Sequence, residues 1–199
     1  MSMSAVYFDR LFAEHDDPWA FRQRWYEQRK RDLIMASLPH QQYQRSLEVG
    51  CANGELSLAL AERSSDFLGM DLCQRAVELA RDRLAGCTHA RIEQGDVPHD
   101  WPQGCFDLIV LSEVGYYLTP GHWAHVVQHA ERSLHANGVL LACHWLQPIQ
   151  GCPMQGDQVH QLLHRELSLP HLLLHQERDF VLEIWTADAS VPNLQELVN

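Results

Sequence analysis

The apolar residues of this chain gather in short runs that alternate with longer amphipathic stretches, and this alternation constrains the fold more than any other feature. Five runs have the length and composition of strands, near 45–50, 66–71, 90–94, 105–112 and 138–145. Between them lie stretches with a helical period, near 54–63, 74–85 and 121–135. Strands that alternate with helices form a parallel sheet covered by helices. The sequence therefore predicts a doubly wound α/β fold.

Both ends of the chain add to this core. Two apolar runs near the C-terminal end, His171 to His175 and Phe180 to Thr186, are separated by a few polar residues, which predicts an antiparallel hairpin and a mostly parallel seven-stranded sheet. Before the first strand, helices are expected over Val6 to Glu14 and Trp19 to Leu38, with Asp17 as N-cap of the second. We expect a single domain over 1–199, with a helical lid in 1–40 and the α/β core in 45–186.

Size and charge exclude several classes of protein. With 199 residues and 46% hydrophobic content, the chain has enough material for one core. A net charge of −11, with Lys30 as the only lysine, argues against nucleic acid as a partner, because such proteins need a positive stripe. The apolar runs are shorter than the roughly 20 residues that cross a bilayer, and no secretory signal pattern is visible. We expect a cytoplasmic protein with a small-molecule partner.

The cysteines and clustered histidines give no metal signal. The six cysteines include no C-x-x-C pair, so we expect reduced thiols rather than a disulfide framework or a zinc knuckle. His122, His125 and His129 share one helix face. They lack evident carboxylate or cysteine partners, so the interpretation is a solvated helix face and no metal.

The strongest local motif is the glycine-containing turn from Leu47 to Gly54, which ends a strand and opens a helix. Gly50 and Gly54 allow a sharp turn and a close approach of backbone to a ligand. The dinucleotide fingerprint is not met, since Ser57 stands where its third glycine would be. Glu48 would repel a pyrophosphate, so the turn favours a cofactor that carries an ammonium group.

Carboxylates follow the next strands. Asp71 ends the second strand, where an acidic side chain can accept the two hydroxyls of a ribose. Asp96, within Gly95-Asp96-Val97, follows the third strand and is placed to accept from an adenine amino group. Each alone is as well explained by a cap or a turn, but their order and spacing together favour a nucleoside site. The predicted cofactor-binding residues are Tyr26, Arg29, Glu48, Gly50, Cys51, Ala52, Gly54, Asp71, Leu72, Gly95, Asp96, Val97 and Ser112.

These motifs resemble those of class I S-adenosylmethionine-dependent methyltransferases over roughly residues 45–186. The residues that carry the resemblance are Glu48 to Gly54, Asp71, Gly95-Asp96 and Phe106 to Val110. More narrowly, Asp17-Pro18-Trp19, Tyr26-Glu27 with Arg29-Lys30, and Ser112 to Leu118 resemble the nodulation protein S group. That group includes N-methyltransferases acting on a de-N-acetylated chitooligosaccharide. The resemblance implies S-adenosylmethionine as cofactor and an amine or hydroxyl acceptor, for example on an amino sugar or oligosaccharide, with an N-methyltransferase favoured.

Methyl transfer requires an aligned nucleophile and, for a protonated amine, a proton acceptor. Ligands of open α/β sheets lie beyond the carboxyl ends of the strands, which selects residues after the fourth and fifth strands. His144 is the first choice for proton acceptor and Glu113 the second catalytic candidate, holding either the cofactor or an amine. The predicted substrate-binding residues are Tyr116, Tyr117, Trp145, Asp157 and His160. The alternative for Asp157 is a helix cap, and for His160 a surface position.

The lid also has two interpretations. Trp19, Tyr26 and Arg29 either contact the cofactor, with the guanidinium paired to its carboxylate, or pack as an ordinary helix. Three other functions compete with methyl transfer: a dinucleotide-dependent oxidoreductase, a nucleic-acid methyltransferase, and a cofactor-binding module without turnover. The imperfect glycine pattern argues against the first, and the missing basic patches argue against the second.

Overall fold

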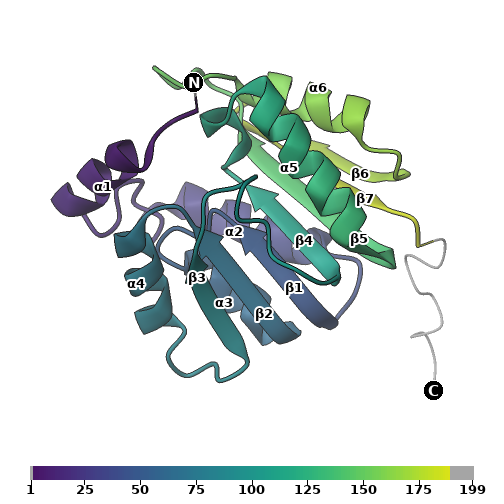
Figure 1. Ribbon diagram of the computed structural model, residues 1–199, viewed down its shortest axis with the longest axis horizontal. Coiled ribbons are helices and arrows are strands. Elements are labelled where there is room, and N and C mark those ends of the chain that lie inside the picture. Colours follow the sequence, from purple (N-terminus) through teal and green to yellow (C-terminus); the bar gives the residue numbers. More distant parts are fainter. Residues whose placement is uncertain (1, 189–199) are drawn as a thin grey trace.

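A seven-stranded sheet forms the centre of the computed structural model, which describes residues 2–188 (Figure 1). The strand order is β3-β2-β1-β4-β5-β7-β6. The strands are β1 (Tyr43–Val49), β2 (Ser64–Asp71), β3 (Ala90–Gln94), β4 (Phe106–Ser112), β5 (Leu134–Trp145), β6 (His171–Gln176) and β7 (Phe180–Thr186). The first five are mutually parallel, and β7 is antiparallel to both β5 and β6. The predicted fold and terminal hairpin are confirmed; residues 189–199 of the predicted domain lie outside the described part.

Helices cover both faces of this sheet. They are α1 (Ala5–Glu14), α2 (Trp25–Ser37), α3 (Glu55–Glu62), α4 (Gln74–Arg83), α5 (Pro120–Ser133) and α6 (Gly156–Glu166), with a short 3₁₀ turn η1 (Gly115–Tyr117). One core cluster joins α5 and α6 to one face, and a second joins α2, α3 and α4 to the other. No helix within residues 2–188 is long and apolar enough to cross a membrane.

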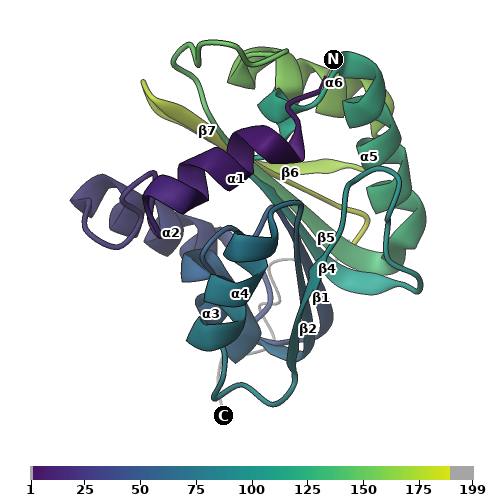
Figure 2. The ribbon, with the colours of Figure 1, turned by 60° about the vertical axis from the view of Figure 1, so that its left-hand side comes forward.

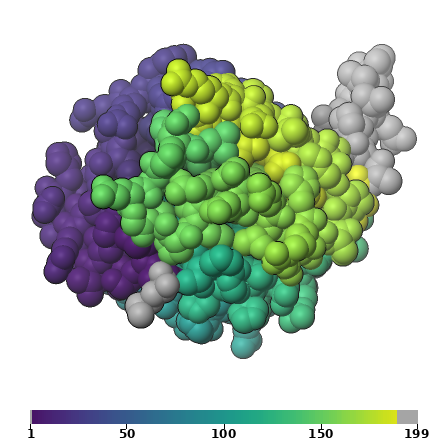
Figure 3. Space-filling view, turned by 90° about the horizontal axis from the view of Figure 1, so that it is seen from above, coloured from purple at the N-terminus to yellow at the C-terminus, as the bar shows by residue number. Residues whose placement is uncertain are grey.

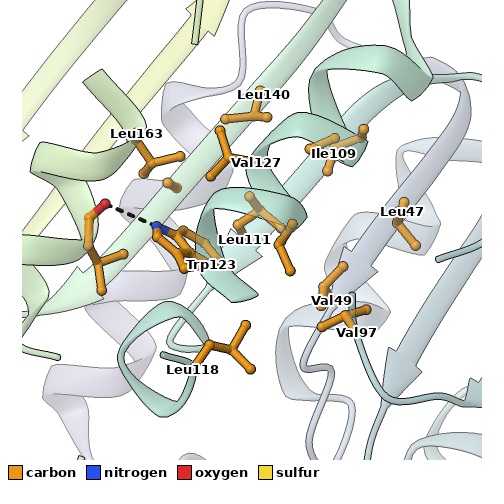
Figure 4. Packing of buried hydrophobic residues seen from close by; sticks show 14 of the residues in the cluster. Leu47, Val49, Val97, Ile109, Leu111, Leu118, Trp123, Val127, Leu140 and Leu163 are labelled. Atoms are coloured by element: carbon orange, nitrogen blue, oxygen red, sulfur yellow. Dashed lines mark hydrogen bonds between the residues drawn. The ribbon is translucent and has the colours of Figure 1, made fainter. Parts of the chain in front are cut away.

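The alternation of side chains along β4 shows how the two cores divide. Ile109 and Leu111 point into the α5 and α6 side, whereas Leu108 and Val110 point into the α2, α3 and α4 side. Figure 4 shows the first cluster, where Trp123 of α5 packs against β4 and donates its indole N–H to the Val159 carbonyl of α6 at 3.1 Å. Buried apolar side chains on both faces show that β4 and β1 are covered on both sides at the centre of the sheet.

The first helix, α1, lies across the end of the sheet at which the parallel strands finish. Figure 2 shows α1 above α4, with its first turns on the side of α5 and its last turns on the side of α2. Phe12 of α1 packs with Cys73 and Leu79, and the Met3 N–H donates to the Tyr117 carbonyl at 2.8 Å. In Figure 3 these N-terminal residues, in purple, form one flank of the molecule beside the green residues that follow β5. Helices are therefore present in the N-terminal segment as expected, and its role as a lid stays a prediction.

The expected helix from Trp19 to Leu38 is wrong in its first part. The helix begins only at Trp25, because Ala20 takes a left-handed conformation with φ 57° and the chain turns there. Asp17 still caps, but it caps this turn: its carboxylate accepts from the Phe21 and Arg22 N–H groups at 2.8 and 3.0 Å. The turn directs Trp19 and Phe21 towards the end of the sheet.

Candidate functional site

The turn between β1 and α3 has an unusual backbone. Gly50, Ala52 and Gly54 have φ of 78°, 47° and 80°, so three of five consecutive residues are left-handed. The turn is held to β2, because the Gly50 and Cys51 N–H groups both donate to the Met70 carbonyl. A Cβ on Gly54 would lie 3.0 Å from the Ala80 Cα, and one on Gly50 would lie 3.3 Å from the Val114 Cβ. The glycines thus allow the turn to lie close to both α4 and the segment after β4.

Asp71, at the end of β2, organises the neighbouring turns. Its carboxylate accepts from the Ala52 N–H and the Cys73 N–H, both at 2.9 Å. Burial raises the pKa of Asp71, against the lowering effect of these backbone hydrogen bonds. Each carboxylate oxygen has two lone pairs, so Asp71 keeps acceptor capacity for a ligand.

The cavity beside this turn has a volume of about 300 Å³, at the lower end of the size range of small-molecule sites. Its floor comes from the ends of β1, β2 and β3, including Gly50, Ala52, Asp71, Leu72, Gly95 and Val97. Asp96 is exposed at its rim. The N-terminal segment supplies an aromatic wall of Tyr7, Phe8, Phe12, Trp19 and Phe21. The structure thus brings seven of the predicted cofactor-binding residues to one cavity.

A smaller hollow beside it holds three further predicted residues, Glu48, Cys51 and Ser112. Glu48 is 3% exposed and accepts a hydrogen bond of 2.5 Å from the Ser57 hydroxyl. Burial raises the pKa of Glu48 to about 7, although the Ser57 hydrogen bond acts in the opposite direction. Gly54, also predicted as a cofactor residue, faces α4 and lies off both hollows.

The acceptor side of the cavity is centred on Glu113, which follows β4. This residue has a left-handed backbone with φ 56°. Residues other than glycine rarely adopt this conformation, and those that do are often found at functional sites. Its Oε1 lies 2.6 Å from the Lys30 Nζ, and its Oε2 accepts from the Tyr116 hydroxyl at 2.5 Å and from the Trp145 N–H at 3.1 Å. Glu113, Tyr116, Tyr117 and Trp145 all line the cavity. Four of the seven predicted catalytic and substrate-binding residues therefore line this cavity together.

Lys30 is a buried cation beside two carboxylates. Its Nζ lies 3.0 Å from the Glu27 Oε2 in addition to its contact with Glu113. Burial disfavours the ammonium, but the carboxylates of Glu113 and Glu27 outweigh it and hold the pKa of Lys30 above its ordinary value. The ammonium of Lys30 balances only one of the two carboxylates, so a net charge of −1 remains on this side of the cavity. Sequence reasoning assigned no role to Glu27 or Lys30, although Lys30 is the only lysine in the chain.

The lid residues predicted to hold the cofactor are placed differently. Arg29 forms a two-pronged ion pair with Glu177, at 2.9 and 2.6 Å, and lies off the cavity, so its predicted role is not supported. Tyr26 also lies off the cavity, with its ring packed edge-on against Trp145. The arginine that lines the cavity is Arg24, for which no ion pair is formed within residues 2–188. Arg24 immediately precedes α2, so its position at the cavity could have been predicted only if the start of this helix had been predicted correctly.

His144 and His160 lie in the core rather than on the cavity. His144 is fully buried, its Nε2 accepts the Gly115 N–H at 3.0 Å, and its Nδ1 lies 3.0 Å from the His160 Nε2. Burial, and then the charges of His160 and Lys30, hold the pKa of His144 well below its ordinary value. Neither side chain reaches the cavity, so the structure does not place His144 as the proton acceptor or His160 as a substrate ligand; His144 instead bonds to the backbone at Gly115.

Asp157, the last predicted substrate residue, is exposed in the first turn of α6 and lies off the cavity. Its alternative interpretation as the helix cap is wrong as well, because Gln155 occupies the cap and exchanges hydrogen bonds with Gln158. Trp145, the neighbour of His144 along β5, does face the cavity.

Comparison with known proteins agrees with this geometry. The sequence profile of the family described as methyltransferase domain matches residues 47–138. A candidate methyltransferase from Pseudomonas syringae of known structure is 46% identical, with a TM-score of 0.74, and the alignment covers 82% of this chain and 99% of that one. The chain belongs to the class I S-adenosylmethionine-dependent methyltransferases.

Within these methyltransferases the chain is similar to the nodulation protein S group. Nodulation protein S of Sinorhizobium fredii is 35% identical over 104 residues, which is 52% of this chain and 48% of that protein. This chain thus spans about half the length of the curated relatives it matches. A solved structure in this group is the N-methyltransferase NodS from Bradyrhizobium japonicum in complex with S-adenosylhomocysteine. It aligns with a TM-score of 0.81 and 23% identity over 92% of this chain and 97% of that one, which supports the fold.

The site fits the family cofactor on chemical grounds. The left-handed turn at Gly50 leaves a surface without side chains beside the cavity, and Asp71 offers a carboxylate at the end of the adjacent strand. Arg24 and the aromatic wall provide partners for a carboxylate and for a sulfonium. S-adenosylmethionine is therefore the cofactor that these residues are suited to hold.

Proposed function

We propose that this methyltransferase transfers a methyl group from S-adenosylmethionine to an amine of a small molecule, such as an amino sugar or a de-N-acetylated oligosaccharide. The observation that carries the proposal is the position of Glu113, a left-handed residue whose carboxylate lines the cavity between the glycine turn and the two tyrosines. The 46% identical Pseudomonas syringae protein supports methyl transfer. The similarity to nodulation protein S, whose Bradyrhizobium japonicum structure is named an N-methyltransferase, supports an amine acceptor.

Residues at the ends of β2 and β3 would bind the adenosine part of the cofactor. Asp71 would accept the ribose hydroxyls and Asp96 the adenine amino group, with Leu72 and Val97 on either side of the base. Arg24 takes the role of pairing with the cofactor carboxylate that sequence reasoning gave to Arg29.

Glu113 would hold the acceptor. When bound, S-adenosylmethionine supplies a methyl group on a positively charged sulfur, which an amine lone pair attacks in line. The Oε2 of Glu113 is occupied by Tyr116 and the Trp145 N–H, whereas Oε1 has a free lone pair beside Lys30 and can accept an N–H of the amine. The negative charge that remains at this wall favours binding of a protonated amine over a neutral hydroxyl group. A protonated amine must lose a proton before its lone pair can attack, and the Glu113 Oε1 is the group that would accept this proton.

A turnover assay tests the function. Chitooligosaccharides with free amines, their N-acetylated forms and glucose oligomers are incubated with S-adenosylmethionine, and S-adenosylhomocysteine is measured. We expect turnover only with the free amines, and a loss of kcat of roughly a hundredfold in Glu113→Gln with affinity for S-adenosylhomocysteine retained. Asp157→Asn, on an exposed helix turn, is the matched control and should be unchanged.

Three results would decide against the proposal. Turnover of hydroxyl acceptors with none of amines would replace N-methylation by O-methylation. Binding of NAD in place of S-adenosylhomocysteine in a calorimetric titration would indicate the oxidoreductase. Cofactor binding without turnover of any acceptor class would indicate a binding module.

A further inference from the structure

At the far edge of the sheet from β3, three imidazoles gather around one carboxylate. Glu183 of β7 is buried, with a side chain 3% exposed. Its Oε1 lies 2.7 Å from the His164 Nε2 of α6 and 3.0 Å from the His171 Nε2 of β6, and its Oε2 lies 2.5 Å from the His160 Nδ1. These residues come from three elements, so no spacing in the sequence reveals the cluster.

We propose that His164, His171 and Glu183 bind one divalent transition-metal ion of the zinc class. Two imidazole nitrogens and one carboxylate oxygen are a ligand set that zinc and its neighbours accept, whereas magnesium and calcium require oxygen ligands. The three ligand atoms lie within 4.8 Å of one another. The proposal is independent of the methyl transfer described above.

Side-chain movement would bring the three ligand atoms to the separation that an ion requires. Zinc bonds of 2.0–2.1 Å in a tetrahedral site place ligand atoms about 3.3 Å apart. Each histidine nitrogen would move away from the Glu183 Oε1 by roughly half an ångström, and the two nitrogens, which lie within 4.8 Å of each other, would approach that separation. Both histidine side chains are partly exposed, at 49% and 33%, which permits that movement and leaves the fourth position open to solvent. Both rings pack on the buried Trp185, with centroids 5.4 and 5.3 Å away, which limits their orientations.

A chain of buried hydrogen bonds fixes the carboxylate from behind. The His144 Nε2 accepts the Gly115 N–H, so a neutral His144 carries its proton on Nδ1 and donates it to the His160 Nε2. His160 in turn carries its proton on Nδ1 and donates to the Glu183 Oε2. This arrangement leaves Oε1 as the oxygen that faces the two exposed histidines. Outer partners of this kind orient metal ligands in proteins.

Calorimetric titration with zinc chloride tests the site, using the full chain without a histidine tag. The Cys105→Ser background removes the exposed thiol. We expect one equivalent of zinc to bind, with an affinity reduced by roughly a hundredfold or more in His164→Gln/His171→Gln. His125→Gln, an exposed histidine of α5, is the matched control and should leave zinc binding intact.

Both substituted histidines are partly exposed, so the double variant should fold, and its circular dichroism spectrum checks this. Zinc should also raise the Tm of the parent chain and not that of the double variant, since a ligand that binds only the folded state stabilises it. Equal zinc affinity in the double variant and the parent, the absence of saturable binding in the parent, or equal binding of magnesium would overturn the proposal. In these cases the cluster would hold protons alone.

Discussion

The ammonium of Lys30 lies 2.6 Å from the Glu113 Oε1, so the buried side of α2 is tied directly to the residue that follows β4. This contact joins the N-terminal segment to the centre of the sheet at the wall of the cavity. Glu27 completes the pair from the preceding turn of α2, and the hydroxyl of Tyr116 holds the other oxygen of Glu113. The position of α2 is therefore coupled to the geometry of the proposed acceptor site.

Replacing Lys30 by methionine should destabilise the chain strongly. The substitution keeps the volume of the side chain but leaves Glu27 and Glu113 close together without their cation. Breaking a buried ion pair by removing one partner costs about 3–5 kcal/mol. Urea unfolding at neutral pH measures this, and Lys30→Met/Glu113→Gln should recover part of the loss. A Lys30→Met variant as stable as the parent chain would show that the cation is unimportant for folding.

Asp71→Asn should weaken binding of S-adenosylhomocysteine by roughly tenfold to a hundredfold, because hydrogen bonds to a charged group contribute about 1.5–3 kcal/mol. The amide also replaces one of the two oxygens that accept from Ala52 and Cys73. Calorimetry measures the affinity. Asp66→Asn, on the same strand but paired at the surface with Arg45 and Arg91, is the matched control. An equal loss in both variants would remove Asp71 from the cofactor site.

Glu48 should make the chain less stable as the pH rises from about 4.5 to 7. Burial raises its pKa to about 7 in the folded state from an ordinary value of 4.5, so in this range the folded state binds more protons than the unfolded state. Stability then falls with increasing pH, by up to about 3 kcal/mol. In Glu48→Gln this component disappears, so the difference in unfolding free energy between the two chains should change across this window. A constant difference would contradict a buried, proton-binding Glu48.

The sequence predicted the sheet and most helices because periodicity reports which faces are buried. All seven strands were located, but the start of β5 was missed: its first four residues are partly or fully exposed, and Leu134 joins the sheet by pairing with Phe106 of the neighbouring strand. A pairing partner on another strand leaves no local pattern. The start of α2 was missed because the chain turns at Ala20, which has a left-handed backbone. A glycine or an asparagine at this position would have indicated such a turn, but an alanine does not.

The site was predicted as far as backbone position determines it. The rule that ligands lie beyond the carboxyl ends of strands selected both His144 and Trp145, but consecutive strand residues face opposite sides of the sheet. Trp145 reaches the cavity and His144 the core under α6. In the same way, the sequence did not fix which side of α2 faces the sheet: Lys30 is buried there, whereas Trp25 is 72% exposed.

His144→Asn should destabilise the chain and change its response to acid in the direction opposite to Glu48→Gln. Loss of the imidazole leaves the Gly115 N–H and His160 without their partner, at a cost of about 1–3 kcal/mol for unsatisfied buried groups. Burial, and then the charges of His160 and Lys30, hold the pKa of His144 well below 6.5 in the folded state. The unfolded chain therefore binds more protons below pH 6.5, and the parent chain loses stability as the pH falls through that range.

The Asn variant lacks this protonation, so its deficit in unfolding free energy should shrink as the pH is lowered from 6.5. Urea unfolding at several pH values measures the deficit. His125→Asn, at an exposed site on α5, provides the control. A deficit that stays constant or grows in acid would show that His144 is protonated in the folded protein, and would restore it as a candidate proton acceptor.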